Sequence, residues 1–204
     1  MRSLRLLLLV AVLALTAQAV TINYTVTGTT DLGFTLQLTF SLDQNPSVLA
    51  SGADWFGVVP LADPPITLSM NGVSYGATVL DVGFYGGLMP MLVVEIVAPE
   101  TGGCTADNWC MLGMSGPQLY TGPEAAPTLL TGAFPATPFP SAPGGEVGYL
   151  TLHSGGWGAA FYSGLVQAQE DSVPEPATAG LLLLAAGATA FGLRKRRAVP
   201  SRDR

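Results

Sequence analysis

Apolar and polar residues alternate along several stretches of the chain between residues 20 and 170. In residues 34–42, Phe and Leu take every second position, and Thr, Gln and Ser stand between them. A period of two puts successive side chains on opposite faces, so this pattern indicates strands with one buried face. It predicts strands at residues 21–27, 34–42, 66–70, 73–75, 78–85, 91–97, 147–153 and 157–166.

Asn71-Gly72 separates two of these strands, and Asn-Gly is the strongest short signal for a β-hairpin. A two-residue turn pairs Met70 with Val73. The apolar residues of both strands then share one face: Ile66, Leu68, Met70, Val73 and Tyr75.

The remaining stretches complete the prediction of an all-β fold. Residues 92–97 are more uniformly apolar than the alternating stretches, which is typical of a central strand covered on both faces. Residues 98–145 hold six prolines between Pro117 and Pro140, so we expect long loops there, with one short strand near 118–120. No useful helical periodicity occurs outside the two ends of the chain. The sequence predicts an antiparallel β-sandwich or jelly roll of about seven or eight strands.

The first 19 residues have the three parts of a secretory signal peptide. Two arginines precede ten apolar residues, 6–15, and Ala17-Gln18-Ala19 then forms a small-residue site that suits cleavage before Val20. A membrane anchor is the alternative, but ten residues fall short of the roughly 20 that span a bilayer. The exported protein would therefore reach an oxidising compartment.

A second targeting segment occupies the C-terminal end. Pro174-Glu175-Pro176 favours an extended backbone. The uncharged residues 177–193 follow, and as a helix they would measure about 25 Å against a hydrocarbon core of about 30 Å. The basic cluster Arg194-Lys195-Arg196-Arg197 would stay on the cytoplasmic side of such a transmembrane segment.

This tail closely resembles the PEP-CTERM sorting signal of exported bacterial proteins. The resemblance covers about residues 173–197 and is carried by the Pro-Glu-Pro motif, the Leu/Ala/Gly-rich span and the basic cluster. A plain membrane anchor would explain the span and the charges but not Pro-Glu-Pro. The resemblance implies cleavage near the motif by an exosortase, a transient stay in the inner membrane, and a final place at the cell surface or outside the cell. The chain then divides into a signal peptide, 1–19, an exported domain, 20–172, and a sorting tail, 173–204.

Composition and charge narrow the functions of the exported domain. The chain has 204 residues, 49% of them hydrophobic, which suits one globular domain with tails. There is no Lys or Arg between Leu6 and Leu193. This excludes a nucleic-acid partner, which needs basic side chains, and an enzyme with a basic phosphate clamp. The domain's acids should form a solvated acidic surface, since no D-x-D-x-D calcium motif is present.

Few residues in the exported domain are candidates for chemistry. His153 is the only histidine, and its place in an alternating strand puts it opposite the apolar face. Cys104 and Cys110 should form a structural disulfide in an exported protein. A catalytic triad and a standard zinc site would both need more than these residues supply, so we expect no catalytic residues, metal or cofactor.

Aromatic side chains suggest a binding role instead. Trp55 and Trp109 stand beside Asp and Asn in predicted loops, a composition suited to glycan binding, although rings that cap the sandwich would look the same. The leading hypothesis is a non-enzymatic envelope or extracellular-matrix protein, because the resemblance implies biofilm-forming, exopolysaccharide-producing bacteria. A carbohydrate-binding module that uses these tryptophans is the alternative. A hydrolase ranks third.

Overall fold

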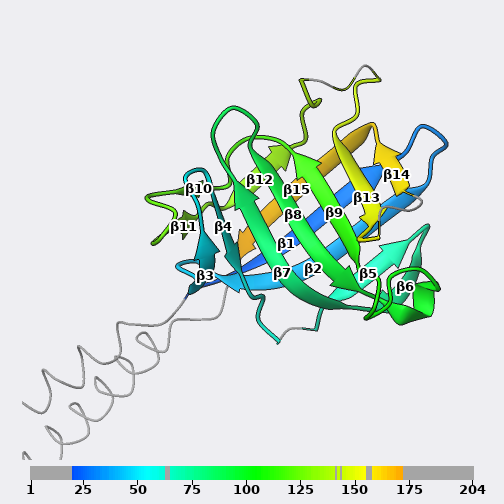
Figure 1. The fold of residues 1–204 in the computed structure, drawn as a ribbon, viewed down its shortest axis with the longest axis horizontal. Coiled ribbons are helices and arrows are strands. Elements are labelled where there is room, and N and C mark those ends of the chain that lie inside the picture. The colour runs from blue at the N-terminus through cyan, green and yellow to red at the C-terminus, as the bar shows by residue number, and fades with distance from the viewer. Residues whose placement is uncertain (1–19, 63–64, 141, 143, 155–157, 172–204) are drawn as a thin grey trace, which may run out of the picture. The chain divides into compact units, whose positions relative to one another are not determined.

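The computed structural model describes residues 20–62, 65–140, 142, 144–154 and 158–171 (Figure 1). Residues Ala19–Asp171 form one compact unit. The signal peptide and the sorting tail, including the predicted span 177–193, lie outside the described residues. Among the described residues, no helix is long and apolar enough to cross a membrane.

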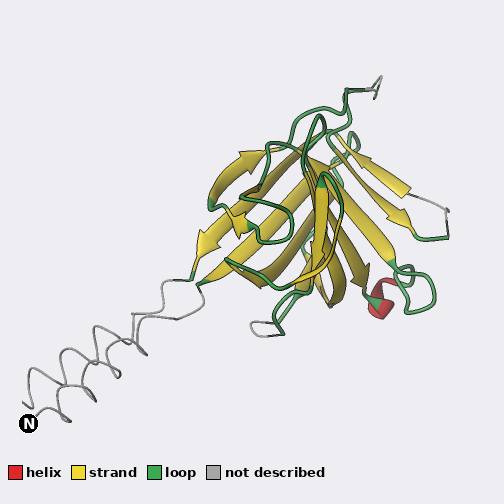
Figure 2. Ribbon diagram, turned by 60° about the vertical axis from the view of Figure 1, so that its left-hand side comes forward, coloured by secondary structure: helices red, strands yellow, loops and turns green. Residues whose placement is uncertain are grey.

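Two antiparallel sheets make up most of the unit. The six-stranded sheet has the order β12 (Gly132–Pro135), β15 (Ser163–Glu170), β1 (Thr21–Thr29), β2 (Thr35–Asp43), β5 (Thr67–Met70), β6 (Val73–Gly76). The seven-stranded sheet has the order β14 (Gly158–Phe161), β13 (Gly148–Leu152), β9 (Cys110–Ser115), β8 (Met91–Val97), β7 (Thr78–Tyr85), β4 (Trp55–Val58), β3 (Val48–Ser51). The short strands β10 (Tyr120–Thr121) and β11 (Thr128–Leu129) pair with each other, and η1 (Pro99–Thr101) is a single turn of 3-10 helix. Figure 2 shows strand throughout the described unit apart from that turn and the loops.

The hydrophobic core lies between the two sheets. Alternate residues of β1 are buried, as the period-two pattern predicts, and β2 and β8 behave alike. Tyr24 on β1 stacks on Phe40 of β2 with ring centroids 5.2 Å apart. It also meets Phe84 of β7 edge-on at 6.2 Å, so this ring joins the two inner faces. The predicted all-β antiparallel sandwich is confirmed.

The Asn71-Gly72 hairpin is also confirmed. Met70 pairs with Val73, and Leu68 pairs with Tyr75. Both turn residues have positive φ, 49° for Asn71 and 80° for Gly72, which a two-residue turn of this kind requires. Asn71 Oδ1 also accepts a hydrogen bond from the Thr35 backbone N–H at 2.9 Å, which ties the turn to β2.

Three expectations about the number and bounds of the strands need correction. Residues 98–145 are not all loop, because they contain β9, a strand inside the seven-stranded sheet, and β12 at the edge of the other sheet. The strand predicted at 157–166 is two strands, β14 and β15, which lie in different sheets. The described strands also outnumber the seven or eight expected.

The central strand β8 is covered on one face only. Its buried residues alternate with half-buried ones, so its outward side chains, among them Val93 and Glu95, lie on an open sheet face. The expectation of a strand covered on both faces is therefore wrong, and the outer face is where the candidate site lies.

Candidate functional site

A row of small residues crosses the outer face of the seven-stranded sheet. Gly57 of β4 pairs with Gly83 of β7, which pairs with Val93 of β8. Val93 pairs with Gly113 of β9, and Gly113 pairs with Tyr149 of β13. Cross-strand partners lie side by side on one face, so the three glycines leave room for larger side chains to lie over the neighbouring strands.

Aromatic rings lie over two glycines of this row and over Gly52, which follows β3. A Cβ on Gly83 would come within 3.1 Å of the Tyr85 ring. A Cβ on Gly113 would collide with the Tyr149 ring, and one on Gly52 would collide with the Trp55 indole. Each ring therefore occupies space that a side chain beneath it would take. We call Trp55, Tyr85, Tyr149 and Phe139 the aromatic band.

The rings of the aromatic band are nearly parallel within each neighbouring pair. Trp55 and Tyr85 have centroids 6.2 Å apart and an interplanar angle of 21°. Tyr149 and Phe139 are also 6.2 Å apart, at 29°. Burial raises the pKa of the Tyr149 hydroxyl, and the nearby Tyr85 hydroxyl raises it further.

The aromatic band is long, and two of its four rings are exposed, while Tyr149 and Phe139 are half-buried. Trp55 and Tyr85 are each 37% exposed. From β4 to β13 the band crosses four strand spacings, or about 19 Å. This length would accommodate an extended ligand.

Two carboxyl groups lie beside the band. Asp81 of β7 pairs with Glu95 of β8, one position outside the glycine row on the same face. The register shifts between Val79 and Asp81, and such a bulge re-aims side chains. One Asp81 carboxyl oxygen, Oδ1, is buried without a hydrogen-bond partner among the described residues. Burial raises the Asp81 pKa, against the lowering effect of the Val82 and Val58 backbone N–H groups.

The two tryptophans predicted as a pair do not come together. Trp55 belongs to strand β4 rather than to a loop, and its row runs through Tyr85 and Met91 to Ser115, the last residue of β9. Trp109 precedes Cys110, the first residue of β9. The two rings therefore lie toward opposite ends of the seven-stranded sheet.

Trp109 packs as a structural residue. Its ring stacks on His153 with centroids 3.7 Å apart, and its Nε1 is buried without a described partner. The His153 backbone N–H donates to the Trp109 carbonyl at 2.8 Å. His153 is exposed, as predicted, but its ring is engaged in this stack.

The predicted disulfide is confirmed. Cys104 and Cys110 are bonded, with Cα atoms 5.1 Å apart. The backbone bridge between Ala98 and Cys104 holds the same segment against the end of β8. Among the described residues, no group of three or more His, Cys, Asp or Glu side chains is arranged to hold a metal ion.

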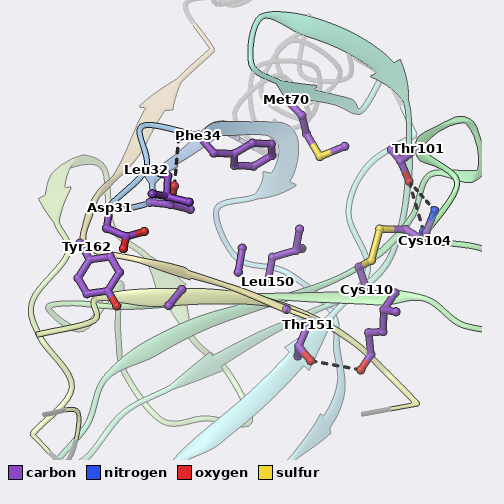
Figure 3. A pocket seen from close by; sticks show the side chains of 16 residues that line it. Asp31, Leu32, Phe34, Met70, Thr101, Cys104, Cys110, Leu150, Thr151 and Tyr162 are labelled. Carbon is purple, nitrogen blue, oxygen red and sulfur yellow. Dashed lines mark hydrogen bonds between the residues drawn. A yellow bond between two sulfur atoms is a disulfide. The ribbon is translucent and has the colours of Figure 1, made fainter. Parts of the chain in front are cut away.

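A cavity lies between the two sheets. It has a volume of about 590 Å³ and is lined by the β1–β2 connection, by β13 and β14, and by the disulfide. In Figure 3, Phe34 and Met70 lie on one side of the cavity, toward the six-stranded sheet. Leu150 of β13 and the disulfide lie on the other side. This cavity is separate from the aromatic band, which lies on the outer face.

Sequence reasoning nominated Trp55 but missed Tyr85, Tyr149 and Phe139. One signal was available: Gly83 and Gly113 interrupt apolar stretches, and a glycine inside a strand marks a place where another group approaches the backbone closely.

Comparison with known proteins identifies the tail alone. The model of the PEP-CTERM protein-sorting motif matches residues 172–197. No curated protein and no solved structure matches the chain. The motif indicates an exported protein that exosortase processes, and the resemblance of the tail to this sorting signal is confirmed.

Proposed function

We propose that this chain delivers a non-enzymatic, polysaccharide-binding β-sandwich to the cell surface or extracellular matrix. The observation that carries the proposal is the aromatic band, because Trp55, Tyr85 and Tyr149 lie on the outer face of the seven-stranded sheet. Sugar rings present apolar C–H faces, which stack on flat aromatic surfaces. The carboxyl groups of Asp81 and Glu95 would accept hydrogen bonds from sugar hydroxyls at the side of the band.

Charge selects the class of polysaccharide. No Lys or Arg occurs between Leu6 and Leu193, so the domain has no side-chain cation to pair with an acidic glycan. Asp81 and Glu95 would also repel one. The proposed ligand is therefore a neutral polysaccharide bound as an extended chain, and an exopolysaccharide matrix is a natural setting for it.

Glycan arrays followed by calorimetry test the binding proposal. Trp55→Ala and Tyr149→Ala should each weaken binding of a neutral glycan about tenfold, which corresponds to 1.4 kcal/mol. Tyr75→Ala removes a half-buried ring from β6 of the other sheet and is the matched control. Equal affinity in all four proteins would refute the aromatic band as the binding surface.

Glycoside hydrolysis is a second candidate, favoured by the Asp81–Glu95 pair. Glycosidases use two carboxyl groups, one of them with a raised pKa, and burial raises that of Asp81. New reducing ends that appear with wild type and vanish with both Asp81→Asn and Glu95→Gln would establish this activity. We expect none, because Glu95 is only half-buried on the outer face of the sheet and stays in contact with water.

The sorting tail supports a processing route. Pro-Glu-Pro favours an extended backbone, the form that an enzyme can hold in a cleft, and the basic cluster should keep the end of the chain in the cytoplasm. We expect a mature protein that runs from Val20 to near Pro176. Glu175→Ala, or deletion of residues 194–197, should leave a precursor in the inner membrane. Mass spectrometry of surface material checks this, and wild-type peptides from beyond Ala177 would contradict it.

A further inference from the structure

We propose that the cavity between the sheets binds a single alkyl chain whose head group is neutral or cationic. This site goes beyond the proposed glycan function, because it lies inside the sandwich and uses none of the aromatic band. Its walls, its mouth and the charge of the domain each restrict the ligand.

The walls of the cavity are apolar. Leu150 of β13 pairs with Ala159 of β14, and both line the cavity together with Phe34, Met70 and Leu152. The Cys104–Cys110 disulfide forms a further part of the wall. A volume of about 590 Å³ equals on the order of twenty water molecules, which suits one alkyl chain of ordinary detergent or lipid length.

The threonines near the cavity are already hydrogen-bonded to the backbone. Thr101 Oγ1 donates to the Ala98 carbonyl at 2.7 Å, and Thr30 Oγ1 accepts from the Phe34 backbone N–H at 3.1 Å. Since these groups have partners, the interior offers little to a polar ligand. An alkyl chain would replace water along the apolar walls, which is favourable.

The opening of the cavity has an apolar rim and carries negative charge. Leu32 is 91% exposed in the β1–β2 connection, beside Asp31 (Figure 3). The Tyr162 hydroxyl donates to Glu146 Oε1 at 3.5 Å. Partial burial raises the Tyr162 pKa, and the Glu146 and Asp31 carboxylates raise it further, so this hydroxyl remains a neutral donor. An anionic head group would meet two carboxylates here and no cation, whereas a neutral or cationic head would be accepted.

Three probes with the same dodecyl chain test the proposal on the exported protein: dodecyltrimethylammonium, dodecyl sulfate and a dodecyl oligoethylene glycol ether. Native mass spectrometry and displacement of a neutral fluorescent dye, both below micelle-forming concentrations, report stoichiometry and affinity. We expect one chain per domain for the cationic and neutral probes. At low ionic strength, dodecyl sulfate should bind at least tenfold more weakly.

Variants locate the bound chain. Ala159→Phe fills the cavity and should weaken binding at least tenfold, while Ala50→Phe makes the same change on the exposed edge strand β3 and should change nothing. Tyr149→Ala, whose side chain lies on the opposite face of β13 from Leu150, should also leave alkyl binding unchanged.

Two surface variants keep the test decisive if Ala159→Phe does not fold. Leu32→Gln should weaken all three probes several-fold, because its side chain is exposed and forms the rim. Asp31→Asn should reduce the preference for the cationic over the anionic probe. Tightest binding of dodecyl sulfate, or alkyl binding that neither Ala159→Phe nor Leu32→Gln alters, would overturn the proposal.

Discussion

At Gly113, the lack of a side chain lets the Tyr149 ring lie directly on the backbone of β9. Gly83 does the same beneath Tyr85. The outer part of the Tyr149 ring and its hydroxyl therefore cover Gly113. The glycines thus set the orientation of the aromatic band, although they would contact no ligand themselves.

Gly113→Ala tests this role. The new Cβ would collide with the outer part of the Tyr149 ring, a flexible side chain, so the ring should move while the strand remains. We expect about tenfold weaker glycan binding with a change in unfolding free energy below about 1 kcal/mol. Gly76→Ala is the control, since a Cβ there meets nothing within 4 Å.

A second measurement separates ring position from ligand binding. Burial and Tyr85 raise the Tyr149 pKa in wild type. Displacement of the ring by Gly113→Ala should bring that pKa back toward 10.0, as followed by ultraviolet titration of tyrosine. An unchanged pKa together with unchanged affinity would show that the ring does not depend on Gly113.

The sequence indicated which kind of residue belongs to the candidate site better than it indicated which residues lie next to each other there. Trp55 was nominated because it is a tryptophan beside Asp54, but the ring that it stacks on, Tyr85, comes from β7. Which strands lie adjacent depends on long-range pairing, and the pattern of one strand does not contain that information. For the same reason, Trp109 was grouped with Trp55, although the two residues lie toward opposite ends of the seven-stranded sheet.

At the scale of elements, strands with clear alternation were predicted well, and β9 was missed. The predicted ranges 78–85 and 91–97 agree with β7 and β8. In β9, the outward positions hold Met111 and Gly113 rather than polar residues, so the alternation is hidden. The outward glycine that concealed the strand is the one that carries the Tyr149 ring.

The disulfide is the feature of β9 that can be tested most directly. Cys110 begins the strand, and its bond to Cys104 closes a loop with a sequence separation of 6. Loop-closure entropy for so short a ring is worth about 2 kcal/mol. We therefore expect Cys104→Ser to lower the free energy of unfolding by about 2 kcal/mol in urea titrations. A reductant should lower the stability of wild type by the same amount as the substitution and should not affect the variant. Equal stability of wild type and variant without reductant would contradict this prediction.

At the scale of the whole molecule, the charge of the domain and the burial of its acidic groups both raise pKa values. The domain has no Lys or Arg side chain, and the resolved pKa shifts of its acidic groups are all upward. A group with a raised folded pKa holds its proton more tightly in the folded state. Its contribution to stability is complete below the unfolded pKa and is lost as the pH rises through the folded value. For Asp81 this loss begins near 3.8, and for the tyrosines near 10.0.

Tyr24 should dominate the alkaline side of that profile. Its ring is 1% exposed, its hydroxyl has no partner among the described residues, and burial raises its pKa strongly. Wild type should therefore lose stability steeply as the pH rises past 10.0, because unfolding releases the Tyr24 proton. Tyr24→Phe removes both the titrating group and the cost of a buried, unpaired hydroxyl. We expect it to raise the unfolding free energy by about 1 kcal/mol at pH 7 and to flatten the alkaline decline.

Chemical denaturation of both proteins across pH 7 to 11 measures the effect, with Tyr75→Phe as a control on the half-buried edge strand β6. The difference between Tyr24→Phe and wild type should widen as the pH increases, because only wild type must keep a buried phenol protonated. A difference that stays constant with pH would mean that the Tyr24 hydroxyl reaches solvent or a partner. A variant less stable than wild type at pH 7 would mean that the hydroxyl contributes a favourable contact inside the core, at the point where the two sheets meet.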